Sequence, residues 1–203
     1  MSLRPSLRPR PPVRGFTLIE LLVTIAIAAI LMALAAPALK TAICSRAVVS
    51  QSAELLEGLH FARSEAMKRS GPVTICKTTV AAPTTCAAGG TWANWMVFAE
   101  KAGGATGVRE SAEASLRQHA QASSSWVTWA ATTPANVNFV TFQSTGIALS
   151  DNGGGGVAPA SMTIPVKPTL DNAAAQAVKN FTRQVCLNAQ GRASVVDGNL
   201  TCP

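Results

Sequence analysis

Tyrosine is absent from this chain of 203 residues, which also has only two histidines and ten acidic residues. General acid–base catalysis usually depends on histidine or on paired carboxylates, so few candidates for such a site exist. No nucleophile and base pair stands out either, and the sequence predicts neither an enzyme nor a cofactor. Charged residues make up 13% and apolar residues 48%, which excludes general disorder and predicts one globular unit beside a membrane segment.

Metal and nucleotide sites lack their usual motifs. No C-x-x-C pair occurs, and His60 and His119 are distant in sequence from the cysteines, so no metal site is expected. The glycines from Gly153 to Gly156 are not followed by Lys-Ser or Lys-Thr. We therefore interpret them as a loop and not as a phosphate-binding motif.

Basic charge is concentrated at the amino terminus. The formal net charge is +7, and four of the 17 Lys and Arg residues lie within residues 1–15, where there is no acid. Without residues 1–15, thirteen basic residues face ten acidic ones, a balance of +3. A mildly basic mature chain gives little support for nucleic-acid binding, which needs clustered Lys and Arg.

An uncharged run from Leu21 to Leu39 predicts a membrane-spanning helix. At 1.5 Å per residue it is about 28 Å long, close to the thickness of the hydrocarbon core of a bilayer. A cleaved signal peptide would also fit, with Ala33–Ala35 or Ala36–Ala38 at its cleavage site, and so would an uncleaved anchor. Neither alternative explains Glu20, because an unpaired carboxylate in lipid costs several kcal/mol.

The run Arg14-Gly15-Phe16-Thr17-Leu18-Ile19-Glu20 resembles the class III signal of type IV pilins and type II secretion pseudopilins. The resemblance implies that a prepilin peptidase cleaves after Gly15 and methylates the new amino terminus, Phe16, while the apolar helix is retained. It also implies that the Glu20 carboxylate pairs with the free amine of a neighbouring subunit during assembly. The basic leader favours a cytoplasmic amino terminus, so the mature chain would be a single-pass inner-membrane protein with a periplasmic head.

One long helix is predicted from Phe16 to about Ser70, with a kink at Pro37 where the lipid ends. The sequence Arg69-Ser70-Gly71-Pro72 supplies a basic last turn, a glycine stop and a proline, so we expect the helix to end there. Beyond Lys40 the helix becomes amphipathic and is interpreted as packing on the chain's own head. Its expected contact stripe consists of Val48, Ser52, Leu55, Leu56, Leu59, Ala62 and Ala66.

After Pro72, short runs rich in Val, Thr, Trp and Phe alternate with Gly and Pro, which predicts a β-rich head. The expected strands are 72–76, 91–100, 124–130, 136–143, 161–166 and 181–187. The large aromatic residues alternate at strand spacing, so we interpret them as core and not as a base-stacking surface. They are Trp92, Trp95, Phe98, Trp126, Trp129, Phe139, Phe142 and Phe181.

A second set of segments resembles the GspH/FimT branch of minor pilins and pseudopilins, which includes FimU-like proteins. The segments are Phe61–Ala66, Gly71–Cys76, Trp92–Phe98 and the pair Gly191-Arg192 between Cys186 and Cys202. This chain has Asn94 where the branch usually has glycine and Glu100 where it usually has aspartate. The resemblance implies a pilin-like α+β fold in which a long N-terminal helix packs against a β-rich head. Its expected parts are a cleaved leader at 1–15, a transmembrane half-helix at 16–39, an amphipathic half-helix at 40–71 and a periplasmic head at 72–203.

Five cysteines leave at least one unpaired within the monomer. A periplasmic head lies in an oxidising compartment, where disulfide bonds persist, although sequence alone leaves the pairing open. We favour Cys76 with Cys86 and Cys186 with Cys202, because each pair closes a loop between predicted strands. Cys44 would then stay free near the membrane.

The resemblance implies a structural subunit, a minor type IV pilin that primes or supports pilus assembly at or near the tip. Its implied partners are the prepilin peptidase, other major and minor pilins, and the inner-membrane assembly platform. A minor pseudopilin of a type II secretion system is an open alternative, since both systems share every motif described above.

A DNA-binding minor pilin for natural transformation is the second alternative. Some members of the branch bind DNA through a loop with Gly-Arg, any residue, and a second Arg. Here Gly191-Arg192-Ala193-Ser194 keeps only the first arginine, and Lys179 and Arg183 are the other candidate contacts. The competing interpretation is a solvated hairpin in which Gly191 supplies the turn.

Overall fold

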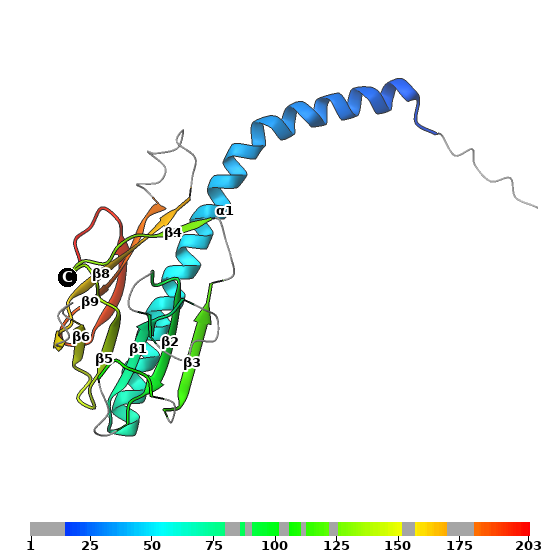
Figure 1. The fold of residues 1–203 in the computed structure, drawn as a ribbon. Coiled ribbons are helices and arrows are strands. Elements are labelled where there is room, and N and C mark those ends of the chain that lie inside the picture. Colours follow the sequence, from blue (N-terminus) through cyan, green and yellow to red (C-terminus); the bar gives the residue numbers. More distant parts are fainter. Residues whose placement is uncertain are drawn as a thin grey trace, which may run out of the picture. The chain divides into compact units, whose positions relative to one another are not determined.

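The structure, a computed structural model, is drawn in Figure 1. It describes residues 15–79, 86–87, 91–101, 106–110, 113–121, 126–151, 157–169 and 181–203. The chain divides into two units, Met1–Lys40 and Thr41–Pro203, and each is described by itself. Helix α1 (Leu18–Arg69) supplies residues to both units. The arginines of the expected leader lie outside the described residues.

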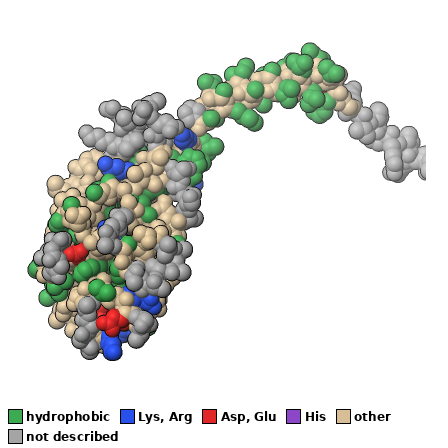
Figure 2. Space-filling model, viewed as in Figure 1, with side chains coloured by type: hydrophobic (Ala, Val, Ile, Leu, Met, Phe, Trp, Pro, Cys, Tyr) green, Lys and Arg blue, Asp and Glu red, His purple; other side chains and the backbone are tan. Residues whose placement is uncertain are grey.

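Helix α1 starts at a side-chain cap. The Glu20 N–H donates a hydrogen bond to Thr17 Oγ1 at 3.2 Å, and the spacing of Thr17 and Glu20 is that of a capping box. The large apolar side chains that follow are exposed in the first unit, as Leu18 (81%) and Leu34 (72%) illustrate (Figure 2). By length and composition α1 can cross a membrane. It runs through Pro37 without a break, and the kink expected there stays a prediction.

The second unit buries the stripe expected on α1. Val48, Ser52, Leu55, Leu59, Ala62 and Ala66 are each exposed by 2% or less, while Leu56 is half-buried. The opposite side of this part of the helix, for example Val49 and Met67, is exposed. Heptad spacing therefore identified the face of α1 that contacts the head.

The helix ends in a Schellman motif. Gly71 N–H donates to Ala66 O at 3.2 Å and Ser70 N–H to Met67 O at 3.4 Å, which is the bonding pattern of this motif. The expected stop is therefore present, with one difference. The residue in the left-handed conformation is Ser70, with φ of 52°, and Gly71 occupies the next position.

Two antiparallel sheets form the head. In the described residues the strands are β1 (Val73–Lys77), β2 (Asn94–Ala99), β3 (Ser115–Ala120), β4 (Val127–Trp129), β5 (Phe139–Phe142), β6 (Ala148–Asp151), β7 (Val157–Pro159), β8 (Met162–Pro168), β9 (Arg183–Leu187) and β10 (Ala193–Asp197). One sheet has the order β3-β2-β1-β5-β6-β7 and the other the order β10-β9-β8-β4. The expected α+β fold is confirmed, and every strand expected from the sequence has a counterpart.

Both sheets and α1 enclose one hydrophobic core. Ile75 pairs with Val97 on β2 and with Val140 on β5, and all three side chains are fully buried against the helix stripe. A smaller cluster of Cys76, Met96 and Phe98 lies on alternate strand positions. Of the eight aromatic residues expected in the core, Trp92, Trp95, Phe98, Trp129 and Phe142 are buried, and the others are half-buried.

Candidate assembly and binding sites

The expected processing site lies at the start of α1. Nothing approaches a Cβ placed on Gly15 within 4 Å, and the Phe16 side chain is 80% exposed. Both residues precede the helix, so their backbone is not locked in helical hydrogen bonds. A segment of this kind is accessible to an enzyme that must bind an extended chain.

Glu20 occupies the third position of α1. None of the ion pairs between described residues involves its carboxylate, which is exposed in the chain. A negative charge in the first helical turn is favoured by the helix dipole, and the capping box orients the residue further. Among the described residues, the Glu20 carboxylate therefore has no counter-charge.

Two disulfide bonds fix the head. Cys76 is joined to Cys86 and Cys186 to Cys202, the same pairs that were favoured from the sequence. Cys44 is in neither disulfide bond and is buried, and its thiol donates to the Thr169 carbonyl oxygen at 3.6 Å. By loop length, each bond stabilises the head by roughly 3 kcal/mol in the chain-entropy model.

A cluster of side chains holds the edge strand β3 against α1, and the sequence analysis missed it. Arg117 of β3 donates to Glu57 of α1 at 2.8 Å, and this hydrogen bond lowers the pKa of the Glu57 carboxyl and raises that of the guanidinium. The Arg117 guanidinium also lies 5.8 Å from the ring centroids of Phe61 and Trp95.

His119 extends the contact between β3 and α1. His119 Nδ1 lies 3.1 Å from Glu54 Oε2, and its ring stacks on Trp95 with centroids 5.3 Å apart. Gly58 leaves the room that this indole needs, because a Cβ there would lie 2.6 Å from the Trp95 ring. The alternation of Arg117 and His119 in β3 was the only available signal, and it does not reveal which helix residues they meet.

Glu100 and Asn94, the two residues that differ from the branch pattern, both accept hydrogen bonds. Glu100 accepts hydrogen bonds from Thr74 Oγ1 at 2.5 Å, from Thr141 Oγ1 at 3.2 Å and from the Gly107 N–H at 2.7 Å. Asn94 Oδ1 accepts the Gln121 N–H at 2.9 Å. These groups would lose partners if either side chain were shortened, which explains why each residue is accommodated here.

The candidate DNA contacts are not brought together. Arg192 is exposed in the turn between β9 and β10, whereas Arg183 starts β9 and forms an ion pair with Asp197. Five residues separate Arg183 from the turn, about 17 Å along an extended strand. Lys179 lies outside the described residues. The two described candidates, Arg183 and Arg192, therefore form no cluster of the kind that phosphate binding requires.

The turn itself matches the solvated-hairpin interpretation. Gly191 has φ of 74° and donates its N–H to Asn188 O at 2.9 Å. A Cβ on Gly191 would lie 2.0 Å from Gly146 O, so this turn also packs tightly on the β5–β6 turn. Arg63 of α1 closes the junction by donating to Gln190 O at 3.2 Å.

No cluster of three or more metal-ligating side chains occurs among the described residues. Lys77 is an unusual buried cation at the end of β1, exposed by only 4%. Burial lowers the pKa of its ammonium group, and the negative charge of Asp151 partly opposes this shift.

Comparison with known proteins adds a family match. Residues 51–201 match the family described as Type II transport protein GspH, and residues 10–36 match the prokaryotic N-terminal methylation motif. No curated protein sequence matches the chain significantly.

Among solved structures, the fold is similar to that of the type IV minor pilin FimU of Pseudomonas aeruginosa strain PAO1. One crystal form, P21, has a TM-score of 0.52 at 17% identity and covers 76% of this chain and 92% of that chain. A second form, P65, has a TM-score of 0.48 at 18% identity and covers 74% and 94%. At such identities the likeness shows the fold alone.

Proposed function

Because the chain belongs to the GspH family and carries the prokaryotic N-terminal methylation motif, we propose that it is a minor pilin that primes or supports type IV pilus assembly at or near the tip. In this role it is cleaved by a prepilin peptidase, anchored by α1 and joined to other pilins on the inner-membrane assembly platform. Its amino terminus is cytoplasmic before cleavage and its head is periplasmic.

The arrangement of the first unit carries the proposal. An apolar helix with exposed side chains follows an accessible Gly15-Phe16 bond, and an acidic residue sits in its first turn. A soluble domain would have no use for such a helix, whereas a fibre buries it among the helices of its neighbours. After cleavage, the methylated amine of one subunit is a suitable counter-charge for Glu20 of the next.

Processing is tested first by the intact mass of the membrane-extracted chain. We expect a chain that begins at methylated Phe16, and we expect Gly15→Leu to leave the leader attached. Glu20→Ala should be processed but should enter pili poorly, while Glu20→Asp should retain part of this ability because it keeps the charge. A mature chain that begins near Lys40 would refute retention of the helix.

The role in pilus assembly is tested by deletion of the gene. We expect the deletion strain to lose most of its sheared surface pili and the complemented strain to recover them. A role in a type II secretion system is the second candidate, favoured by the description of the matched family. It predicts unchanged pili together with a loss of secreted proteins in the same deletion strain. DNA binding is not proposed, because the described candidate arginines lie apart and Arg183 is already paired.

A further inference from the structure

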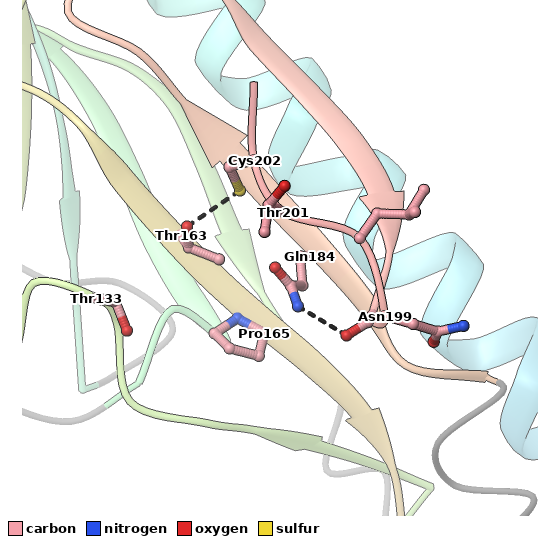
Figure 3. A pocket seen from close by; sticks show the side chains of 9 residues that line it. Thr133, Thr163, Pro165, Gln184, Asn199, Thr201 and Cys202 are labelled. Carbon is pink, nitrogen blue, oxygen red and sulfur yellow. Dashed lines mark hydrogen bonds between the residues drawn. The ribbon is translucent and has the colours of Figure 1, made fainter.

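A groove crosses the outer face of the four-stranded sheet (Figure 3). Thr163 and Pro165 of β8 and Gln184 of β9 form its floor, on the side opposite the buried Ile164 and Val185. The residues that follow β10 form one wall. The groove has a volume of about 570 Å³, and its other lining residues are Thr133, Gly198, Asn199, Leu200, Thr201 and Cys202.

The described lining residues carry no charge. Its side chains are hydroxyls, amides, small apolar groups and a cysteine held in a disulfide bond, so none of them ionises in the ordinary pH range. The neighbouring Arg183 and Asp197 neutralise one another. A charged ligand would lose hydration here without gaining a counter-charge, which favours an uncharged polar occupant.

Several polar groups in the groove have no hydrogen-bond partner among the described residues. Gln184 donates to Gly198 O at 2.9 Å, which leaves its own carbonyl oxygen available. The side chains of Thr133, Asn199 and Thr201 accept and donate no bond within the described chain, and neither does the backbone of Asn199 and Thr201. An unpaired stretch of backbone beside a sheet can bind an extended peptide as an added strand.

These features favour a peptide over a sugar. Among the residues described here, no aromatic ring lines the groove to cover the apolar face of a pyranose, and Pro165 and Leu200 are its sizeable apolar side chains. Beyond the turn at Asp197–Leu200, the unpaired backbone groups of Thr201 and Cys202 suit another polypeptide backbone better.

The wall of the groove depends on the second disulfide bond. Beyond Gly198, the described chain is tied to the sheet by the bond from Cys202 to Cys186 and by the Thr163 hydroxyl, which donates to Cys202 Sγ at 3.0 Å. The Leu200 N–H bonds only to the nearby Asp197 O. Without this disulfide, residues 199–203 lose their main attachment and the groove loses a side.

We propose that this groove is an oxidation-dependent docking site for an extended, uncharged segment of another pilin-type subunit. The segment lies along residues 201–203, pairs with the backbone of Thr201 and Cys202 and places its neutral side chains over Pro165 and Gln184. The choice of partner rests on the proposed function, while the chemistry of the site rests on the groove itself.

The test uses photo-crosslinking from Thr133, replaced by benzoylphenylalanine in the full chain in its own cells. We expect one discrete adduct, in which mass spectrometry identifies a pilin peptide without charged residues. Benzoylphenylalanine at Ser144, which is exposed on the β5–β6 turn, should not give that adduct. The Cys186→Ser/Cys202→Ser double variant should lose it at least several-fold, and the matched Cys76→Ser/Cys86→Ser variant should keep it.

A second pair of variants keeps the disulfide bond intact. Thr201→Pro removes the backbone N–H that would pair with the partner and should weaken the adduct several-fold, while Thr201→Val keeps that N–H and should retain the adduct. The proposal is overturned by an absent adduct, by an adduct to a glycan or to a protein unrelated to pilins, or by an adduct that survives loss of the second disulfide. Sheared pili counted in the same strains test the proposed function separately. If pili depend on the chain but no adduct forms, the docking site is refuted and the proposed function stands.

Discussion

Replacement of Gly58 by alanine tests the contact between α1 and the head most directly. On an exposed helix surface this change stabilises a protein by up to about 1 kcal/mol, because alanine is the better helix former. Here the added Cβ would lie 2.6 Å from Trp95 Cη2 and 2.9 Å from two further ring carbons. Real Cβ atoms do not approach so closely, so the indole or the helix must move.

The indole has little freedom to move. Trp95 is 1% exposed, stacks on His119 and lies beneath the Arg117 guanidinium. Overpacking of this kind costs about 1–3 kcal/mol, which outweighs the gain in helix propensity. We therefore expect Gly58→Ala to lower the free energy of unfolding by about 1–2 kcal/mol, the opposite sign from an exposed site.

The assay is urea unfolding of the full chain in detergent, followed by tryptophan fluorescence and by helical circular dichroism. Ser50→Ala, on the exposed side of α1, serves as the control and should be neutral or slightly stabilising. In the double variant Gly58→Ala/Trp95→Phe the smaller ring should accommodate the methyl group, so the two losses should not add. A stabilised Gly58→Ala protein, or strict additivity of the pair, would refute the packing described here.

Four further changes test other parts of the structure. Ser70→Gly should raise the free energy of unfolding by about 0.5–1 kcal/mol in the same urea assay, because Ser70 holds a positive φ that glycine adopts without strain; no gain would count against the Schellman ending. Gly191→Ala should destabilise the head by more than 1 kcal/mol, since its Cβ would meet Gly146 O at 2.0 Å, and a neutral result would contradict the tight pairing of the two turns. The Glu65 carboxyl has a lowered pKa, chiefly through its hydrogen bond to Arg69. The stability that this carboxylate contributes is therefore complete above its ordinary pKa of 4.5 and is lost as the pH falls through the folded-state pKa. Glu65→Gln should flatten this part of the stability profile measured between pH 7 and pH 3. Purified full chain should not shift duplex DNA at low salt, and a salt-dependent shift lost in Arg192→Ala would restore the DNA-binding hypothesis.

The parts of the fold that sequence predicted well are those with a strong local period. Leu55, Leu59 and Ala62 repeat at helical spacing and are all buried, and strands such as β1 and β5 are short apolar runs between turn residues. Strand β3 was missed because Leu116 is the single large apolar residue in Ser115–Ala120. Its stability comes from Arg117 and His119 meeting α1 some sixty residues earlier in the chain, a contact that no local pattern contains. Strands β6, β7 and β10 were also not expected from the sequence, because they are short and are held by pairing with neighbouring strands.

The same distinction applies to the candidate sites. The amino-terminal motif is a continuous run of residues, so Gly15, Phe16 and Glu20 were identified from sequence as directly as they are found in the structure. The groove on the four-stranded sheet joins Thr133, Thr163, Gln184 and Thr201, which are far apart in the chain, and no spacing rule relates them. Only the cysteine pair gave a hint, because it predicted that the last residues return to β9.

Most acidic side chains of the described head hold its elements together. Glu54 and Glu57 hold β3, Glu65 holds the last turn of α1, and Glu100 joins β1 and β5 to the loop after β2. Glu113 accepts the Lys101 and Glu110 N–H groups, Asp151 accepts the Asn138 amide, and Asp197 neutralises Arg183. The described head also presents a neutral groove and the exposed side of α1, the kinds of surface by which a subunit binds its neighbours.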